Sequence, residues 1–208
     1  SHAQLVPFAG GFIPSNVPNE LRHHPSRQQQ PMADHHAPGI QLPPGAEDSG
    51  DKRVPTGDVI LSDVIGSSKP INLFAGFTRD IDTVSRRLDT TSLNTTVLAP
   101  LNSAIQDLPR KPWEDPREYA QLGAEAYSGS DGEDRAHRNL RRFVEAHVLP
   151  QSPWKEGEKA RTMNGDEIWW EKKGDKAVIL PGEVEVDRIA SQVANGEVWV
   201  LKKALNYS

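Results

Sequence analysis

The histidines of this sequence are the side chains best suited to acid–base or metal chemistry near neutral pH. His147 lies on the apolar side of an expected helix, where a histidine is typically buried and hydrogen-bonded and where a ligand contact is the alternative. Two pairs, His23-His24 and His35-His36, could bind a divalent metal through their imidazoles. Because no cysteine or suitably spaced carboxylate accompanies either pair, the sequence predicts no metal site and no cofactor.

Familiar catalytic motifs are absent from the sequence. It contains no Gly-x-Ser-x-Gly, no phosphate-binding loop and no His-Glu-x-x-His. We therefore expect a protein that is not an enzyme. The alternative is a hydrolase or another enzyme whose reacting groups meet only in three dimensions, and His147 with Glu145 or Asp187 would then be the candidate pair.

A group of arginines lies on one expected helix. Arg135, Arg138 and Arg142 are spaced by three and four residues and therefore share a face. Two interpretations stay open: a solvated face balanced by nearby acidic residues, which we favour, or a site for an anion or a polysaccharide. The net charge of −5 argues against nucleic acid as a partner.

Two asparagines carry the N-glycosylation pattern, Asn94 and Asn206. Asn94 immediately precedes an expected strand, so its side chain should lie at the surface. Asn206 stands two residues before the end of the sequence. Both sites are useful to a chain that passes through the secretory pathway.

Residues 1–54 differ in composition from the rest and predict an N-terminal tail. They hold eight of the 17 prolines, a run of glutamines and no sustained helical or strand periodicity. The apolar start of the tail could dock on its own domain or on a second copy, so homo-association through the tail is a further hypothesis. No apolar run of 18 residues and no signal-peptide pattern occurs, so we expect no transmembrane segment in this chain.

Residues 55–208 predict one domain in which helices precede strands. Apolar residues at steps of three and four indicate a single helix over about 70–88. An N-cap aspartate followed by proline begins another helix over 115–127. The glycine-bearing segment 128–134 lacks the calcium-loop pattern and predicts a solvated loop. A further helix is expected from about 134 until just before Pro150.

The strand signals begin at Thr95–Ala99, a run that Pro100 should end because proline cannot donate to a sheet ladder. Asn102, or Ser103 beside it, is then expected to cap the next helix. Near the C-terminus, residues 172–175 and Asn195-Gly196 predict the turns of two hairpins. The predicted class is α+β, with helices packed on a mostly antiparallel sheet.

Two of these stretches resemble the signatures of fasciclin-like (FAS1) domains. Thr96 to Ile105 is similar to the first signature, and Asn195 to Leu205 is similar to the second. The signature positions are Thr96, Val97, Ala99, Pro100, Asn102, Asn195 and Gly196. Between them, Ala146-His147-Val148 stands where the family has its Tyr-His motif. The run 108–116 further resembles a fungal branch with a single FAS1 domain.

This resemblance implies the FAS1 fold, a wedge of helices on a β-sheet, and a non-catalytic module of the cell-adhesion type. Its partner would be a protein or a cell-wall polysaccharide, in the secretory pathway, the cell wall, the extracellular space or the vacuole. Ala146, His147 and Val148 occupy positions implicated in receptor binding in animal members. Since Ala146 replaces the usual tyrosine, adhesion of the integrin type is not expected.

Overall fold

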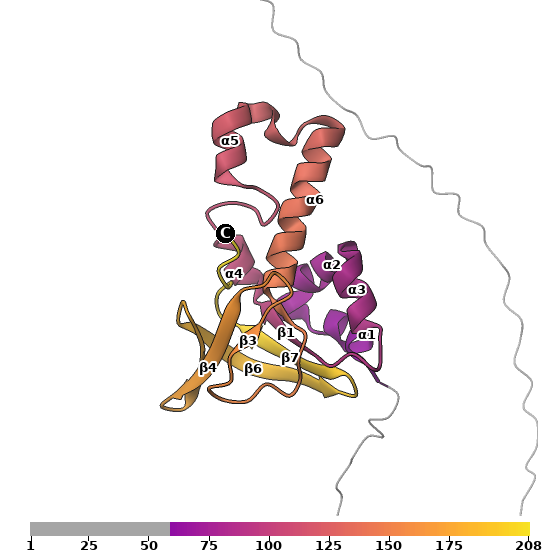
Figure 1. The fold of residues 1–208 in the computed structure, drawn as a ribbon, viewed down its shortest axis with the longest axis vertical. Coiled ribbons are helices and arrows are strands. Elements are labelled where there is room, and N and C mark those ends of the chain that lie inside the picture. Colours follow the sequence, from indigo (N-terminus) through magenta and orange to yellow (C-terminus); the bar gives the residue numbers. More distant parts are fainter. Residues whose placement is uncertain (1–58) are drawn as a thin grey trace, which may run out of the picture. The chain divides into compact units, whose positions relative to one another are not determined.

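A seven-stranded sheet, six α-helices and three 3-10 helices make up residues 59–208, the part of the chain that the computed structural model describes (Figure 1). The helices are α1 (Leu61–Val64), η1 (Ile65–Ser67), η2 (Lys69–Ile71), α2 (Asn72–Asp80), α3 (Asp82–Leu88), α4 (Asn102–Gln106), α5 (Pro116–Leu122), η3 (Gly123–Tyr127) and α6 (Gly129–Ala146). The strands are β1 (Thr95–Pro100), β2 (Val148–Leu149), β3 (Ala160–Arg161), β4 (Glu167–Lys173), β5 (Lys176–Leu180), β6 (Val184–Val193) and β7 (Gly196–Leu201). The predicted tail, residues 1–54, lies outside the described residues.

The sheet has the strand order β2-β1-β7-β6-β5-β4-β3. Strands β1 and β7 run parallel, with Val97 opposite Val198, and the other pairings of the described sheet are antiparallel. The expected α+β class with a mostly antiparallel sheet is therefore confirmed. In Figure 1, α6 extends away from the sheet, and α5 lies beside its far half. Within residues 59–208, no helix combines the length and hydropathy that crossing a membrane requires.

The central strands β1 and β7 supply two hydrophobic clusters, because side chains alternate between the two faces of a sheet. The cluster shared with the helices contains Val97, Ala99, Val198 and Val200, together with Phe74 and Phe143. The cluster on the opposite side contains Leu98, Trp199 and Leu201, together with Trp154 and Ile179. Every residue of β1 is buried, as expected for a strand that is covered on both faces.

The prediction of a single helix over 70–88 is wrong in one respect, because the helical backbone is interrupted at Ile81. There the backbone is extended (φ −108°, ψ 101°), so α2 ends at Asp80 and α3 begins at Asp82. The side chain of Ile81 nevertheless stays in the core. Apolar spacing predicted the burial of this stretch correctly, but it does not detect the break, because the apolar residues of both helices pack into the same cluster.

The solvated loop expected over 128–134 is also wrong, because α6 begins at Gly129. Gly132 is buried in the first turns of this helix, and a Cβ at this position would lie 2.2 Å from the backbone carbonyl carbon of Tyr127. The glycine therefore permits α6 to pack closely against η3. Asp131, in the first turn, further favours a helix because its negative charge complements the helix dipole.

Several boundaries agree with their sequence signals. Asp115 caps α5 by accepting a hydrogen bond from the backbone N–H of Arg117 (2.8 Å), although α5 ends at Leu122 and continues as η3 rather than as one helix. Pro100 is the last residue of β1. The two expected hairpins are formed by β4 with β5 and by β6 with β7.

Candidate functional site

The residues at the Tyr-His position lie inside the domain, at the junction of α6 and β2. Ala146 is 1% exposed, and His147 and Val148 are completely buried. In this structure a partner could not touch their side chains unless α6 moved away from the sheet. A contact role for these three residues stays a prediction that needs such a movement.

Both ring nitrogens of His147 are occupied by the backbone. Nδ1–H donates to the carbonyl oxygen of Phe143 (2.7 Å), and Nε2 accepts from the N–H of Leu205 (2.8 Å). Because Leu205 must donate to Nε2, the neutral ring carries its proton on Nδ1. Burial lowers the pKa of His147 to about 4, while the hydrogen bond to Phe143 acts in the opposite direction. The imidazole is therefore neutral at pH 7 and ties the end of α6 to the C-terminal segment.

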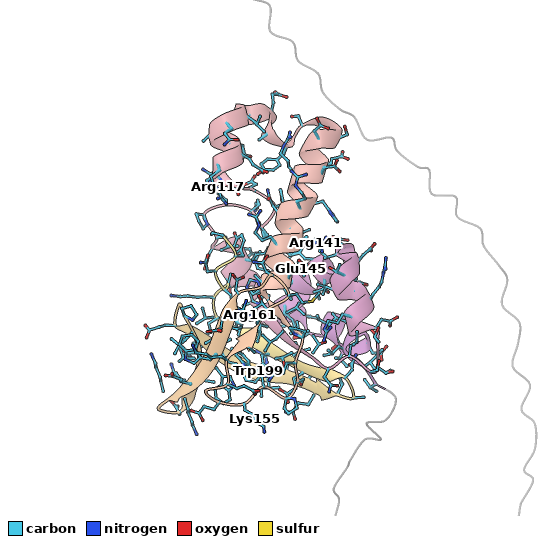
Figure 2. All side chains as sticks on the ribbon, in the orientation of Figure 1. Arg117, Arg141, Glu145, Lys155, Arg161 and Trp199 are labelled. Atoms are coloured by element: carbon cyan, nitrogen blue, oxygen red, sulfur yellow. The ribbon has the colours of Figure 1, made fainter. Side chains whose placement is uncertain are left out.

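The carboxylates that the enzyme hypothesis would pair with His147 have other partners. Glu145 Oε1 accepts hydrogen bonds from Thr83 Oγ1 (2.8 Å) and Arg141 Nε (2.9 Å), and Figure 2 shows Arg141 and Glu145 side by side on α6. Asp187 pairs with its neighbour Arg188 (2.7 Å). Among the described residues, neither carboxylate makes a hydrogen bond to His147. The structure does not assemble the predicted acid–base pair.

The arginine face of α6 consists of Arg135, Arg138 and Arg142, and its members have different environments. Arg135 donates from Nε to the carbonyl oxygen of Ala126 (2.7 Å) and so stabilises the turn that precedes α6. Arg142 is half-buried and lies 3.6 Å from the carboxylate of Asp115. Arg138 is exposed. A basic surface is therefore available mainly at Arg138 and Arg142.

Asn195, from the second signature, is completely buried and joins two helices to the β6–β7 turn. Its Oδ1 accepts from the N–H of Leu61 (2.8 Å), which is the first residue of α1. Its Nδ2 donates to the carbonyl oxygens of Leu88 (2.9 Å), at the end of α3, and Thr90 (3.2 Å). Next to it, a Cβ on Gly196 would lie 1.8 Å from the carbonyl oxygen of Thr95, so a side chain cannot be accommodated.

Asn102, from the first signature, does not cap its own helix as expected. Its Oδ1 accepts from the N–H of Leu73 (3.1 Å), in the first turn of α2, and its Nδ2 donates to Lys69 (2.9 Å). It therefore caps a helix that is distant in sequence, whereas the residue before α4 is Leu101, which offers no side-chain acceptor. Thr96 similarly donates its hydroxyl to the carbonyl oxygen of Gln151 (2.7 Å). The signature residues Val97, Ala99 and Pro100 are buried in β1. Sequence spacing identified the signature, but not which partners its polar side chains would bind.

The two N-glycosylation asparagines, Asn94 and Asn206, are both exposed. Asn94 lies just before β1, as expected, and Asn206 follows the buried Leu205. An oligosaccharide could extend from either side chain without disturbing the core. Whether the sites are modified stays a prediction.

No group of three or more metal-ligating side chains occurs within residues 59–208. The paired histidines His23-His24 and His35-His36 lie outside the described residues.

A pocket of about 660 Å³ lies where α6 faces the segment 108–117 and the last residues of the chain. Its lining includes Leu108, Pro112, Asp115, Asn139, Arg142 and Tyr207. Sequence analysis missed this site. The proline-rich run 108–116 was noted only for its resemblance to a fungal branch. No sequence pattern predicted that Asn139 and Tyr207 would lie beside it.

Comparison with known proteins places the chain among fungal sequences. It is 56% identical over 174 residues to FAS1 domain-containing protein NCU02579 of Neurospora crassa, covering 82% of this chain and 76% of the relative. It is 55% identical to AFUA_8G05360 of Aspergillus fumigatus, covering 71% of this chain and 64% of the relative, and 48% identical to AN1527 of Emericella nidulans, covering 86% and 74%. Each relative carries the description "FAS1 domain-containing protein".

Among solved structures, a FAS1 domain pair from the insect cell adhesion molecule fasciclin I shares the fold, with a TM-score of 0.52 and 14% sequence identity. The match covers 72% of this chain and about half (51%) of the pair. No family model matches the chain. The solved structure therefore supports the architecture, and the fungal relatives carry the evidence for the family.

Proposed function

Because the chain belongs to the family of FAS1 domain-containing proteins, we propose that it is a non-catalytic binding module that acts outside the cytoplasm on a protein or a cell-wall component. The solved protein that shares its fold comes from a cell adhesion molecule. The cell wall, the extracellular space and the vacuole are the proposed locations.

The environment of His147 is the observation that carries the non-catalytic part of the proposal. A general acid or base needs a free ring nitrogen within reach of a substrate. The ring of His147 is buried, and the backbone of Phe143 and Leu205 takes both of its nitrogens. This arrangement favours a structural histidine over the hydrolase alternative.

We propose that a partner is contacted through the exposed part of the arginine face. Arg138 is exposed, and Arg142 lies only loosely against Asp115, so both guanidinium groups have hydrogen-bond donors available. Guanidinium groups recognise carboxylates and other oxyanions, which are present on acidic proteins and acidic polysaccharides.

Co-sedimentation of the glycosylated full chain with isolated fungal cell walls tests this proposal. We expect retention of the wild type, and at least fivefold weaker retention of Arg138→Glu. Arg86→Glu is the matched control, because Arg86 is also an exposed arginine and lies on a different helix, α3, with 82% of its side chain accessible. Protease treatment of the walls distinguishes a protein partner from a polysaccharide. Equal retention of both variants, or no retention of the wild type, would contradict the proposal.

Passage through the secretory pathway is proposed from the exposure of Asn94 and Asn206. When the chain is expressed in a fungal host, digestion with an endoglycosidase should increase its electrophoretic mobility. Replacing Asn94 by Gln should remove one step of this shift. Unchanged mobility of the wild type after digestion would count against glycosylation.

A further inference from the structure

The pocket beside α6 combines a rigid apolar wall with a charged rim. Leu108, Pro112 and Pro116 form part of the wall, and the ring of Tyr207 lines another part. Tyr207 is held in place by an edge-to-face contact with Phe143, with 4.9 Å between the ring centroids. Prolines and a packed aromatic ring lose little conformational freedom when a ligand binds, so these walls are preorganised.

The ionisable side chains that line the pocket are three arginines and two carboxylates, and Ser208, at the end of the sequence, lines it as well. Arg110, Arg117 and Arg142 line it, together with Glu114 and Asp115. Both carboxylates already accept hydrogen bonds from the protein: Glu114 Oε1 from Tyr119 (3.1 Å), and Asp115 Oδ1 from the N–H of Arg117 (2.8 Å). Hydrogen bonds from Arg117 lower the pKa of Asp115, which therefore stays charged at neutral pH.

The arginines of the rim differ in how firmly they are held. Arg117 grips Asp115 through both Nε (3.3 Å) and Nη2 (3.1 Å), and Figure 2 shows its side chain on α5. Arg142 reaches the same carboxylate only at 3.6 Å. Arg110 is exposed and lies over the ring of Tyr119, 5.2 Å from its centroid, and within residues 59–208 no ion pair holds it. Arg110 and Arg142 therefore have donors free for an incoming anion.

Asn139 also lines the pocket, and only the nitrogen of its side-chain amide makes hydrogen bonds within the domain. Asn139 is only 6% exposed. Its Nδ2 donates to Glu118 Oε2 (2.8 Å) and to the carbonyl oxygen of Trp113 (3.1 Å). Within the described part of the chain, Oδ1 accepts no hydrogen bond. This oxygen is not a fully buried atom, because every fully buried side-chain polar atom of the described residues has a hydrogen-bond partner, so it can accept a hydrogen bond from water or from a ligand.

We propose that this pocket binds a small organic carboxylate with an apolar body, whose carboxylate pairs with Arg142 and Arg110 while its body contacts the proline wall and Tyr207. A volume of about 660 Å³ fits such a molecule, since pockets for small ligands are mostly apolar with a few placed polar groups. This site shares Arg142 with the proposed partner surface, but it does not include Arg138, and ligand binding in the pocket does not depend on the partner contact.

Titration of the full chain with 4-phenylbutyrate, followed by backbone NMR, tests the proposal. The neutral 4-phenylbutyramide serves as the matched ligand without charge. We expect shifts confined to residues 108–117, 139–142 and 207, and at least tenfold tighter binding of the acid than of the amide. Arg142→Gln should weaken binding of the acid at least tenfold, and Arg138→Gln, on the same helix but outside the pocket lining, should leave it unchanged.

Arg110→Gln provides a second variant at an exposed position, in case Arg142→Gln disturbs the contact with Asp115. It should weaken binding of the acid at least threefold. Equal affinity for the acid and the amide would overturn the proposal, as would chemical-shift changes centred on other residues. The absence of any shift, when the acid is raised from a 10-fold molar excess to its solubility limit, would also overturn it.

Discussion

Acidification from pH 7 to pH 5 should weaken the fold through His147. In the unfolded chain this histidine titrates near its ordinary pKa of 6.5, whereas in the folded domain burial lowers the pKa to about 4. Between pH 7 and pH 5 the unfolded chain therefore takes up a proton that the folded domain does not. Proton uptake by the unfolded state alone lowers the free energy of unfolding as the pH falls.

The expected loss follows from the two pKa values. It amounts to about 2 kcal/mol between pH 7 and pH 5 and grows to about 3 kcal/mol below pH 4, where the folded domain is also protonated at His147. The stabilisation is fully present above pH 6.5. Burial of the ring justifies the full value, because solvent does not screen it.

Urea unfolding of the full chain at pH 7 and pH 5, followed by tryptophan fluorescence, measures this loss. His147→Gln removes the titrating group but keeps a donor and an acceptor, so its unfolding free energy should fall by about 2 kcal/mol less over this interval than that of the wild type. His137→Gln is the control, since His137 is exposed, and it should behave as the wild type does. Carboxylate titration contributes equally to all three proteins and cancels in the comparison.

Equal pH dependence of the wild type and His147→Gln would refute the reasoning. If His147→Gln does not fold, NMR titration of the wild-type imidazole gives an independent answer. The His147 ring signals should keep their neutral positions down to pH 5, and titration near pH 6.5 would show that burial does not control this group.

Three further substitutions test the contacts of the signature residues by urea unfolding at pH 7. Gly196→Ala should lower the free energy of unfolding by about 2 kcal/mol or more, because the added Cβ would collide with the carbonyl oxygen of Thr95. The control Gly174→Ala has open space around its Cβ and should lower it by about 1 kcal/mol. Equal losses would contradict the steric argument. Asn195→Ala should cost about 2–4 kcal/mol, since it leaves the N–H of Leu61 and the carbonyl of Leu88 without partners, and a loss below 1 kcal/mol would mean that water replaces them. Asn102→Ala should cost about 1 kcal/mol through the lost cap on α2, and amide exchange at Leu73 should accelerate; unchanged exchange would show that Asn102 is not the effective cap.

Much of the fold could be predicted from the sequence, because local signals and the sheet agree in most places. The β-branched and apolar run at Thr95–Pro100 forms a strand that is buried on both faces by two clusters, and the Asn195-Gly196 turn forms as expected. The parallel pairing of β1 with β7 could not be predicted from the sequence, because local residue patterns do not specify which of two distant strands will pair.

Two local errors have the same physical origin. Ile81 breaks a helix pattern, and Gly132 lies inside a helix rather than a loop, because tertiary packing overrides the local preference at both positions. The candidate site was harder to predict. The pocket requires Asn139, Arg142 and Tyr207 to lie against the segment 108–117, from which they are separated by between 22 (139 − 117) and 99 (207 − 108) residues. Local sequence patterns do not encode such a contact.

The central position of β7 constrains the order in which this domain can form. Strand β7 is one of the last elements in the chain, yet it lies between β1 and β6, so β1 lacks its parallel neighbour until residues 196–201 are available. The caps that Asn195 provides for α1 and α3 must also wait for the same hairpin. During synthesis, the helices α1 to α6 can therefore pack only incompletely before β7 has been made. Completion depends on the C-terminal hairpin leaving the ribosome and entering the middle of the sheet, and this non-local step should set the folding rate.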